Sequence, residues 1–265
     1  MFSPRHADLN TTPLGVEIIP MRICLRALLL AIILAGTSMA APPTSPMDQA
    51  LILIQRAKAA YAKINDYECM LLKREKLAEG LSPNHLIQLK VRTAPFCVSM
   101  TWVEPKPCAG QEVCFATGKN DGKMRVKPAG LLGAVGFVSV ALDDARVRKT
   151  SRHSVAQAGI GNVIDMASKG WPLEKEWGLT EVKVTGAVFA KRKCTRVEMI
   201  HPTRAEGKFL HHRNVIYFDQ ENGLPIRVEN YDWPTKPGQE PELLEVFSYV
   251  NLKLNAGVPA TTFER

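Results

Sequence analysis

The residues of this sequence that could carry acid–base or metal chemistry are a few histidines and acids scattered along the chain. An enzymatic site would have to draw on His85, His153, His201, His211, His212, Asp143, Asp144 and Asp165. His211 and His212 are adjacent on an expected strand, so their side chains point to opposite faces and cannot easily share one metal ion. The chain also lacks GxSxG, HExxH and a phosphate-binding glycine loop. We therefore predict a protein that is not an enzyme, with no catalytic residue, no metal site and no cofactor.

One of these histidines, and the cysteines of the chain, have simpler interpretations than a catalytic or metal site. His212 falls on the same expected face as Ile216 and Phe218, where a hydrogen-bonded inner histidine is favoured over a general base. The cysteines beyond the N-terminal region show no CxxC pair and no zinc-like spacing, and they are Cys69, Cys97, Cys108, Cys114 and Cys194. An oxidising compartment would permit a disulfide, with Cys108 to Cys114 the best-placed pair, and burial as small hydrophobic side chains is the alternative.

The N-terminal region has the zones of a secretory signal peptide. A basic zone, an apolar stretch and a run of small residues follow one another between Met21 and Ala41. This order predicts export, with cleavage after Ala40, so that residues 1–40 are an N-terminal extension plus signal peptide and the mature protein is periplasmic or secreted. A retained membrane anchor is the alternative. Thr37 stands where a lipobox would need cysteine, so no lipid attachment is expected there.

The charge of the chain is basic. Its 34 Lys and Arg exceed its 26 Asp and Glu, which gives a formal net charge of +8. This excess suits anionic lipid headgroups, and hence a peripheral membrane contact, or serves only solubility. The densest basic cluster, Arg146–His153, lacks interleaved aromatic residues, so no nucleic-acid partner is expected. A solvated loop is favoured there over a headgroup or polyanion site.

Residues 41–265 are expected to form one mainly β domain behind a single long helix. The helix is predicted between Asp48, as its N-cap, and Asn65, because apolar residues recur there with helical spacing. After Tyr67 the apolar period changes to two. The expected strands are 67–76, 86–92, 95–102, 112–117, 123–127, 181–189, 194–200, 209–219, 224–231 and 243–254. Short strands at hairpin spacing predict an antiparallel meander, either a barrel or one strongly curved sheet.

Asn222 and Gly223 predict a hairpin between the strands 209–219 and 224–231, because both residues tolerate positive φ. A three-residue loop with Gly223 left-handed would pair Ile216 with Val228 and Phe218 with Ile226, which gives one clean apolar face. A two-residue loop would not.

Two stretches interrupt the strand pattern. The glycine-containing apolar run Gly130–Leu142 is interpreted either as a mobile lid or as a buried strand. A short helix follows, and Gly170 is expected to end it.

The strands carry more inward apolar residues than two helices can cover. Phe96, Val98, Met100 and Trp102 alternate onto one side of their strand, and Val246 and Val250 are expected to do the same near the C-terminus. Such stripes either fill a solid core or line a cavity, and a filled core is the default interpretation.

Three stretches resemble the LolA/LolB-like superfamily of periplasmic lipoprotein carriers, whose members have an N-terminal helix and a half-open antiparallel barrel capped by short helices. They are INDYECMLLKREK, LIQLKVRTAPFCVSMTW and YFDQENGLPIRVENYD. Residues 41–265 resemble more closely a bacterial secreted family, the domain-of-unknown-function family 1571, which is placed with that superfamily. None of these motifs is catalytic.

This resemblance implies a half-open β-barrel with an N-terminal helix and a short capping helix, and an interior that binds a lipid acyl chain or another apolar ligand. The protein would then carry lipid or lipoprotein in the cell envelope, with an envelope protein as a further partner. An envelope scaffold or interaction domain with a filled core is the alternative. The residues expected to line the cavity are Phe96, Val98, Met100, Trp102, Ile216, Phe218, Ile226, Val228, Val246 and Val250.

Overall fold

The computed structural model of the protein describes residues 44–236 and 238–265. The predicted signal peptide and its cleavage after Ala40 lie outside this range. Residues 44–265 form a compact unit of their own, which contains every helix and strand given below.

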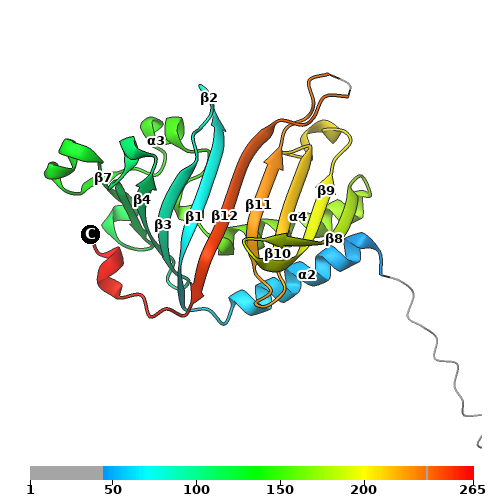
Figure 1. Ribbon diagram of the computed structural model, residues 1–265, viewed down its shortest axis with the longest axis horizontal. Helices are drawn as coiled ribbons and strands as arrows, with labels where there is room; N and C mark the ends of the chain where they lie inside the picture. The colour runs from blue at the N-terminus through cyan, green and yellow to red at the C-terminus, as the bar shows by residue number, and fades with distance from the viewer. Residues whose placement is uncertain (1–43, 237) are drawn as a thin grey trace, which may run out of the picture. The chain divides into compact units, whose positions relative to one another are not determined.

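The central element is one antiparallel sheet of twelve strands (Figure 1). The strands are β1 (Asp66–Leu77), β2 (Gly80–Leu81), β3 (His85–Arg92), β4 (Cys97–Glu104), β5 (Glu112–Ala116), β6 (Met124–Lys127), β7 (Val138–Val140), β8 (Glu181–Phe189), β9 (Arg192–Ile200), β10 (Arg213–Asp219), β11 (Pro225–Tyr231) and β12 (Leu243–Leu254). Their order is β7-β6-β5-β4-β3-β1-β12-β11-β10-β9-β8, with β2 on β1. Two meanders therefore meet at the central β1–β12 pair, and the curved sheet stays open between its edge strands β7 and β8. The predicted mainly β class and open, curved antiparallel sheet are confirmed.

The helical elements are short, apart from two. They are α2 (Pro46–Tyr61), α3 (Ala145–Thr150), α4 (Ile160–Trp177), η1 (Lys106–Cys108), η2 (Asn120–Gly122), η3 (Gly130–Val135), η4 (Val155–Gln157), η5 (Ala205–Gly207) and η6 (Ala260–Phe263). The hydroxyl oxygen of Ser45 caps α2 by accepting the Asp48 N–H at 3.1 Å, so the helix begins before the expected N-cap Asp48. Its buried residues, Ala50, Ile54 and Ala57, follow the expected helical spacing.

Helix α4 is longer than the sequence predicted. It passes through Gly170 and Pro172 and ends only at Gly178, which is left-handed with φ of 64°. Its buried residues keep helical spacing up to Trp171, which is 3% exposed. Burial of this tryptophan outweighs the helix-breaking tendency of its two neighbours.

The start of α4 is fixed by a side chain from the sheet. The Ile160 N–H donates to the hydroxyl oxygen of the fully buried Tyr67 at 3.0 Å. Gly159, with φ of 96°, lies so close that an added Cβ would stand 2.3 Å from this oxygen. Glycine is required there both by the backbone conformation and by the space.

The predicted β10–β11 hairpin is present and Gly223 is left-handed with φ of 74°, but the loop is longer than the expected three residues, because the Asp219 N–H donates to the Leu224 carbonyl oxygen at 2.9 Å. Ile216 pairs with Val228 as expected, but Phe218 pairs with Pro225 instead of Ile226, because the register shifts between Tyr217 and Phe218. Ile226 lies at this irregular step and is buried.

A second irregularity corrects a predicted face. The β1–β12 register shifts between Glu68 and Met70, and Asn251 on β12 has a positive φ of 55°. Beyond this bulge Tyr249 and Phe247 join the main core, while Val250 and Val246 turn to the opposite face. A single extra residue reverses the facing of every residue after it, so simple alternation misplaced both valines.

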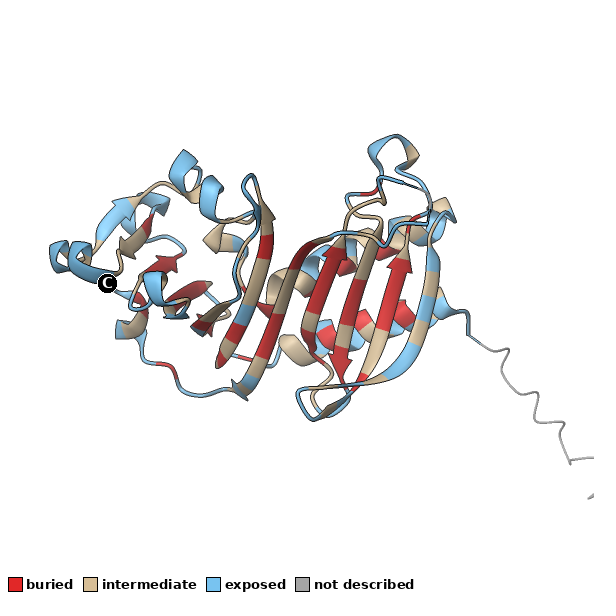
Figure 2. Cartoon of the chain, turned by 45° about the horizontal axis from the view of Figure 1, so that its top comes forward, coloured by how far each residue is buried: buried red, intermediate tan, exposed pale blue. Residues whose placement is uncertain are grey.

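The main core lies between the sheet and the helices, as the red residues of Figure 2 show on β1, β12 and the strands beside them. A smaller cluster on the other face joins Cys97 and Ala116 to Val258 and Phe263 near the C-terminus.

The five cysteines of the described residues are free, which corrects the suggested Cys108–Cys114 disulfide. Four are buried, Cys108 being the exception, in agreement with the alternative interpretation as small hydrophobic side chains. Within the described residues, no helix is long and apolar enough to cross a membrane.

Candidate ligand-binding face

The inner face of the sheet, on which the main core lies, is covered differently on its two sides. The strands β8 to β12 lie under α2 and α4, and we call this side the helix-covered half. On the other side, that of strands β3 to β7, β7 leads into residues 141–158, the cover segment, which packs Leu142, Val147 and Val155 against the main core and whose only regular elements are α3 and η4. We call this side the segment-covered half.

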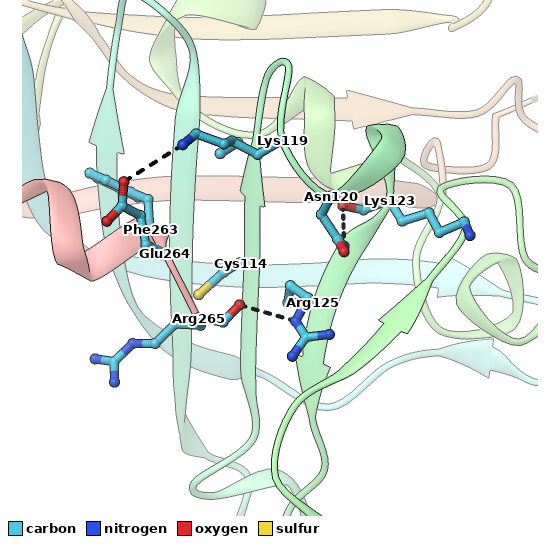
Figure 3. Close-up of a pocket in the computed structure, with 9 residues that line it drawn as sticks. Cys114, Lys119, Asn120, Lys123, Arg125, Phe263, Glu264 and Arg265 are labelled. Atoms are coloured by element: carbon cyan, nitrogen blue, oxygen red, sulfur yellow. Dashed lines mark hydrogen bonds and ion pairs between the residues drawn. The ribbon is translucent and has the colours of Figure 1, made fainter.

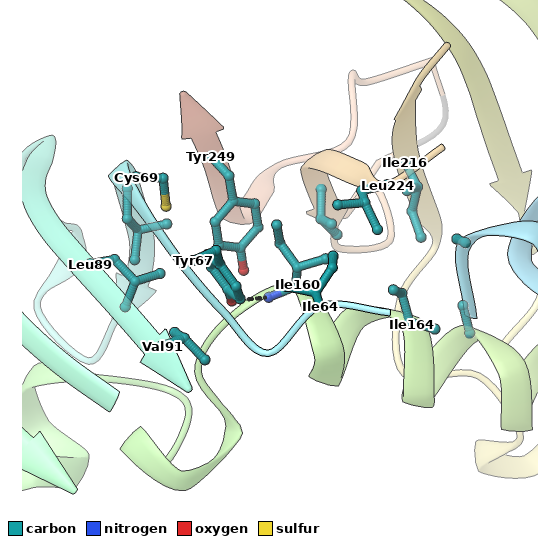
Figure 4. Close-up of a cluster of buried hydrophobic side chains, with 14 of the residues drawn as sticks. Ile64, Tyr67, Cys69, Leu89, Val91, Ile160, Ile164, Ile216, Leu224 and Tyr249 are labelled. Atoms are coloured by element: carbon teal, nitrogen blue, oxygen red, sulfur yellow. Dashed lines mark hydrogen bonds between the residues drawn. The ribbon is translucent and has the colours of Figure 1, made fainter. Parts of the chain in front are cut away.

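The helix-covered half is solidly packed. Trp171 of α4 meets Phe218 edge to face, with ring centroids 6.2 Å apart. Ile164 of α4 faces Ile216 and Leu224 of the hairpin (Figure 4), and these three side chains are at most 3% exposed. Helix side chains therefore fill the space in front of these strands.

The segment-covered half is packed less completely. Val98 and Met100 are buried, but other large apolar side chains of the same face remain half-buried, as does Leu142 of the cover segment: Phe96, Trp102, Val126 and Val140. Phe96 contacts Phe115 with ring centroids 6.3 Å apart. The Trp102 indole N–H donates to His85 Nδ1 at 3.0 Å, which satisfies its one polar atom. This half is an apolar wall under a thin cover.

An ion-pair network attaches the cover segment to the sheet at the β1–β12 pair. Arg152 Nε and His153 Nε2 lie 3.0 and 2.8 Å from Glu245 Oε2. The Arg152 backbone N–H donates to Glu75 Oε1 at 3.3 Å, and Lys73 Nζ lies 2.8 Å from Glu75 Oε2. Glu75 and Glu245 are only 1% and 2% exposed, so these contacts compensate two carboxylates that would otherwise be costly to bury.

The pKa values within this network reflect the pairing. Burial alone would raise the pKa of Glu245, but hydrogen bonds from His153 and Asn230 and the nearby charges outweigh it and lower the pKa to about 2. The hydrogen bond with Glu245 raises the pKa of His153 above its ordinary value. Burial lowers the pKa of His85 in the same half. His153 therefore holds its proton more tightly than His85.

Glu75, His153 and Glu245 have the chemistry of metal ligands, with one donor atom of each within 4.8 Å of the others. Lys73 and Arg152, however, already pair with the two carboxylates. A divalent cation would have to displace both, so we interpret the cluster as an anchor for the cover segment.

The other residues considered for acid–base chemistry are dispersed. His201 stacks on Phe209 and pairs with Glu174 at 3.0 Å, and His212 Nδ1 lies 3.0 Å from the His201 carbonyl oxygen. Burial lowers the pKa of His211. Asp144 caps α3, and Asp165 forms a surface pair with Lys169. Ser151 Oγ accepts a hydrogen bond from Lys73 Nζ at 2.9 Å, and the same amine pairs with Glu75 at 2.8 Å, which ties this serine and lysine into the ion-pair network.

The predicted cavity residues are thus divided among three environments. The segment-covered half holds Phe96, Val98, Met100 and Trp102. The helix-covered half holds Ile216, Phe218 and Val228, with Ile226 buried at the hairpin irregularity. Val246 and Val250 lie on the opposite face.

Sequence reasoning missed the anchor network, although a signal was present. Lys73 and Glu75 follow Tyr67, Cys69 and Leu71 with the period of two, so they continue the inward face of the strand. Charged side chains in such positions need partners from another segment.

A separate hollow of about 450 Å³ lies on the opposite face of the sheet from the main core (Figure 3). Four of its nine lining residues are Lys or Arg and one is Glu: Cys114, Ala116, Lys119, Asn120, Lys123, Arg125, Phe263, Glu264 and Arg265. Arg125 Nε donates to the Arg265 backbone oxygen at 3.0 Å, and Lys119 Nζ is 3.9 Å from Glu264.

Comparison with known proteins identifies a family. The profile of DUF1571, described as a protein of unknown function, matches residues 64–265. A comparison with curated protein sequences finds no match.

Solved structures similar to this chain include three with low sequence identity. An uncharacterized conserved protein from Thermus thermophilus is 6% identical, with 82% of this chain and 93% of that chain covered and a TM-score of 0.47. Lipoprotein LppX from Mycobacterium tuberculosis is 9% identical, with 80% and 97% covered and a TM-score of 0.45. A LolA superfamily protein from Nitrosomonas europaea is 12% identical, with 82% and 97% covered and a TM-score of 0.36.

Proposed function

The chain belongs to the DUF1571 family, whose description states no function, and from its geometry we propose a non-enzymatic protein that binds an apolar ligand. The ligand class is a lipid acyl chain or a molecule of similar shape. The bound ligand lies between the inner face of β3 to β7 and the cover segment. The observation that carries this proposal is the group of large apolar side chains that stay half-buried under a thin cover, beside a half of the same sheet that is solidly packed.

The binding energy comes from completing the burial of this wall. Transfer of one methylene of an acyl chain from water contributes about 0.8 kcal/mol, so a chain of several carbons binds usefully without a polar anchor. Phe96, directly before β4, and Trp102, on β4, lie at the two ends of an apolar stripe, with Val98 and Met100 between them. The stripe supplies a continuous apolar surface of suitable length for such a chain.

The cover segment can admit a ligand without unfolding the domain. Its polar attachments to the sheet are concentrated at Ser151, Arg152 and His153, and the chain after it is held at Ile160, where Tyr67 fixes the start of α4. Between β7 and Arg152 the apolar residues packed against the main core are Leu142 and Val147, which are only partly buried. This part therefore moves at lower cost than α4.

Export to the periplasm or beyond, and carriage of lipid or lipoprotein there, extend this proposal. They rest on the order of basic, apolar and small residues before Ala41 and on the basic net charge. The competing function is an envelope scaffold with a filled core. The solid packing of the helix-covered half supports this alternative.

Titration with a fluorescent fatty acid, beside native mass spectrometry of the form beginning at Ala41, tests the proposal. We expect saturable binding of one ligand and an added mass of lipid size. Phe96→Glu should abolish binding while the thermal melt stays cooperative, and Val188→Glu, at an exposed position on β8, is the matched control that should bind normally. Absence of saturable binding across several lipid classes would remove the ligand function and favour the scaffold.

A further inference from the structure

The most exposed apolar residues of the described chain include a group on one short turn, which we call the apolar tip. Leu131, Leu132 and Val135 of η3 are 96%, 69% and 74% exposed. Gly130 and Gly136, both with positive φ, border the turn. Residues 128–142 contain no acidic residue. Three large apolar side chains therefore project into solvent from a turn that hides none of them.

Cationic side chains surround the tip along the chain. Strand β6 leads directly into it through Arg125 and Lys127, and Lys119 and Lys123 precede that strand. Lys119, Lys123, Arg125 and Arg265 line the hollow of Figure 3. Strand β7, which follows the tip, and the C-terminal residue lie at the same end of the molecule in Figure 1. After β7 in the sequence, helix α3 carries the exposed Arg146, Arg148 and Lys149.

We propose that the apolar tip docks on the surface of a bilayer that contains anionic lipid. Leu131, Leu132 and Val135 enter the boundary between headgroups and acyl chains, while Lys119, Lys123 and Arg125 approach lipid phosphates. Apolar insertion together with basic residues is the combination that gives stable peripheral binding, because each contribution alone is weak.

The shape of the tip favours a bilayer over a protein partner. Stable protein interfaces bury roughly 800 Å² on each partner, whereas three side chains on a convex turn offer much less. A bilayer needs no complementary pocket, and its negative charge matches the cations around the turn. This inference does not depend on ligand binding inside the sheet, because η3 lies outside the cover segment.

Vesicle co-sedimentation of the form beginning at Ala41 tests the docking, since residues 44–265 form a compact unit and the apolar N-terminal stretch would bind vesicles by itself. The two vesicle types are phosphatidylcholine alone and phosphatidylcholine mixed with phosphatidylglycerol. We expect binding to the mixed vesicles that weakens with salt. The double variant Leu131→Glu/Leu132→Glu should bind with an affinity at least about tenfold lower. Its thermal melt should be unchanged because both side chains are exposed.

Two further variants keep the result specific. Leu210→Glu removes a leucine that is 72% exposed on the loop before β10, and it should bind as the unmutated protein does. Lys119→Gln/Lys123→Gln should reduce binding to the mixed vesicles and leave any binding to phosphatidylcholine unchanged. Equal loss from the Leu210 and tip variants, or no binding of the unmutated protein to either vesicle, would overturn the proposal.

Discussion

The two halves of the sheet differ in how their apolar inner face is covered. In the helix-covered half, Trp171 and Ile164 of a long helix fill the space before β10 and β11. In the segment-covered half, the cover segment has only two short helical elements, and Phe96 and Trp102 stay half-buried. Burial of large side chains by a continuous helix produces rigidity, whereas a cover held by a few ion pairs leaves apolar surface available. The difference in cover, more than the apolar composition of the strands, separates core from candidate site.

The largest expected effect comes from charging the same residue type in each half. Phe218→Glu places a carboxylate beside Trp171 at a position 2% exposed and should cost about 4 kcal/mol or more, enough to unfold many domains. Phe96→Glu, at a half-buried position, should cost less than about 2 kcal/mol because the carboxylate reaches water. Denaturant unfolding measures both. Equal losses of stability would show that the halves are packed alike.

The next effect tests the anchor of the cover segment. Glu245→Ala leaves Arg152 and His153 without their shared partner and should lower the free energy of unfolding by about 3 kcal/mol, as removal of one member of a buried ion pair does. Hydrogen exchange should then rise in residues 141–158 more than in α4.

The matched control is another carboxylate with an arginine partner. Glu198 is 8% exposed and lies 3.0 Å from Arg196, far from the cover segment in the strand order. Glu198→Ala should lower stability without selective exchange in residues 141–158. If both variants loosen the segment equally, the anchor role is contradicted.

The sequence predicted the architecture well because the strands have strong alternation. Every expected strand is present within a few residues of its predicted bounds, and the short β2 and β7 were missed. The run Gly130–Leu142 illustrates the limit. It was interpreted as a lid or a buried strand, but it forms an exposed turn followed by the three-residue edge strand β7. An apolar run alone does not reveal whether neighbouring strands leave room to bury it.

The site was harder to predict than the fold, since it depends on backbone irregularities and on distant partners. The bulge near Asn251 moved Val246 and Val250 to the other face, and one asparagine, although it tolerates positive φ, does not by itself predict a bulge. Helix α4 continued past Gly170 because Trp171 has a place to pack. Arg152 and His153 belong to a basic cluster for which the sequence favours a solvated loop. Their partner Glu245 is distant in the sequence and reaches them only in the folded structure.

A smaller effect is expected from pH. The pKa of His153 is raised in the folded protein, so its pairing with Glu245 stabilises fully below the ordinary pKa of histidine and is lost as pH rises through the raised value. The cover segment should therefore loosen on the alkaline side of that pKa. NMR titration should show His153 titrating above, and His85 below, the ordinary histidine pKa. His153→Gln should remove this pH dependence, and its persistence would assign it to another group.

The smallest expected effect distinguishes the two edges of the sheet. Strand β7 has three residues and leads into the cover segment, whereas β8 has nine residues paired along β9. Both are edge strands, so β8 controls for the exposure of unpaired backbone groups. Amides of β7 should exchange faster than the hydrogen-bonded amides of β8, since fewer contacts must break to open them.

Addition of a fatty acid should slow exchange in β7 and residues 141–158 by a few fold and leave β8 unchanged, because only the segment-covered half closes on the ligand. Equal slowing at both edges would indicate a global gain in stability, and β7 exchange as slow as that of the central β1 and β12 would show that this half is as solid as its neighbour.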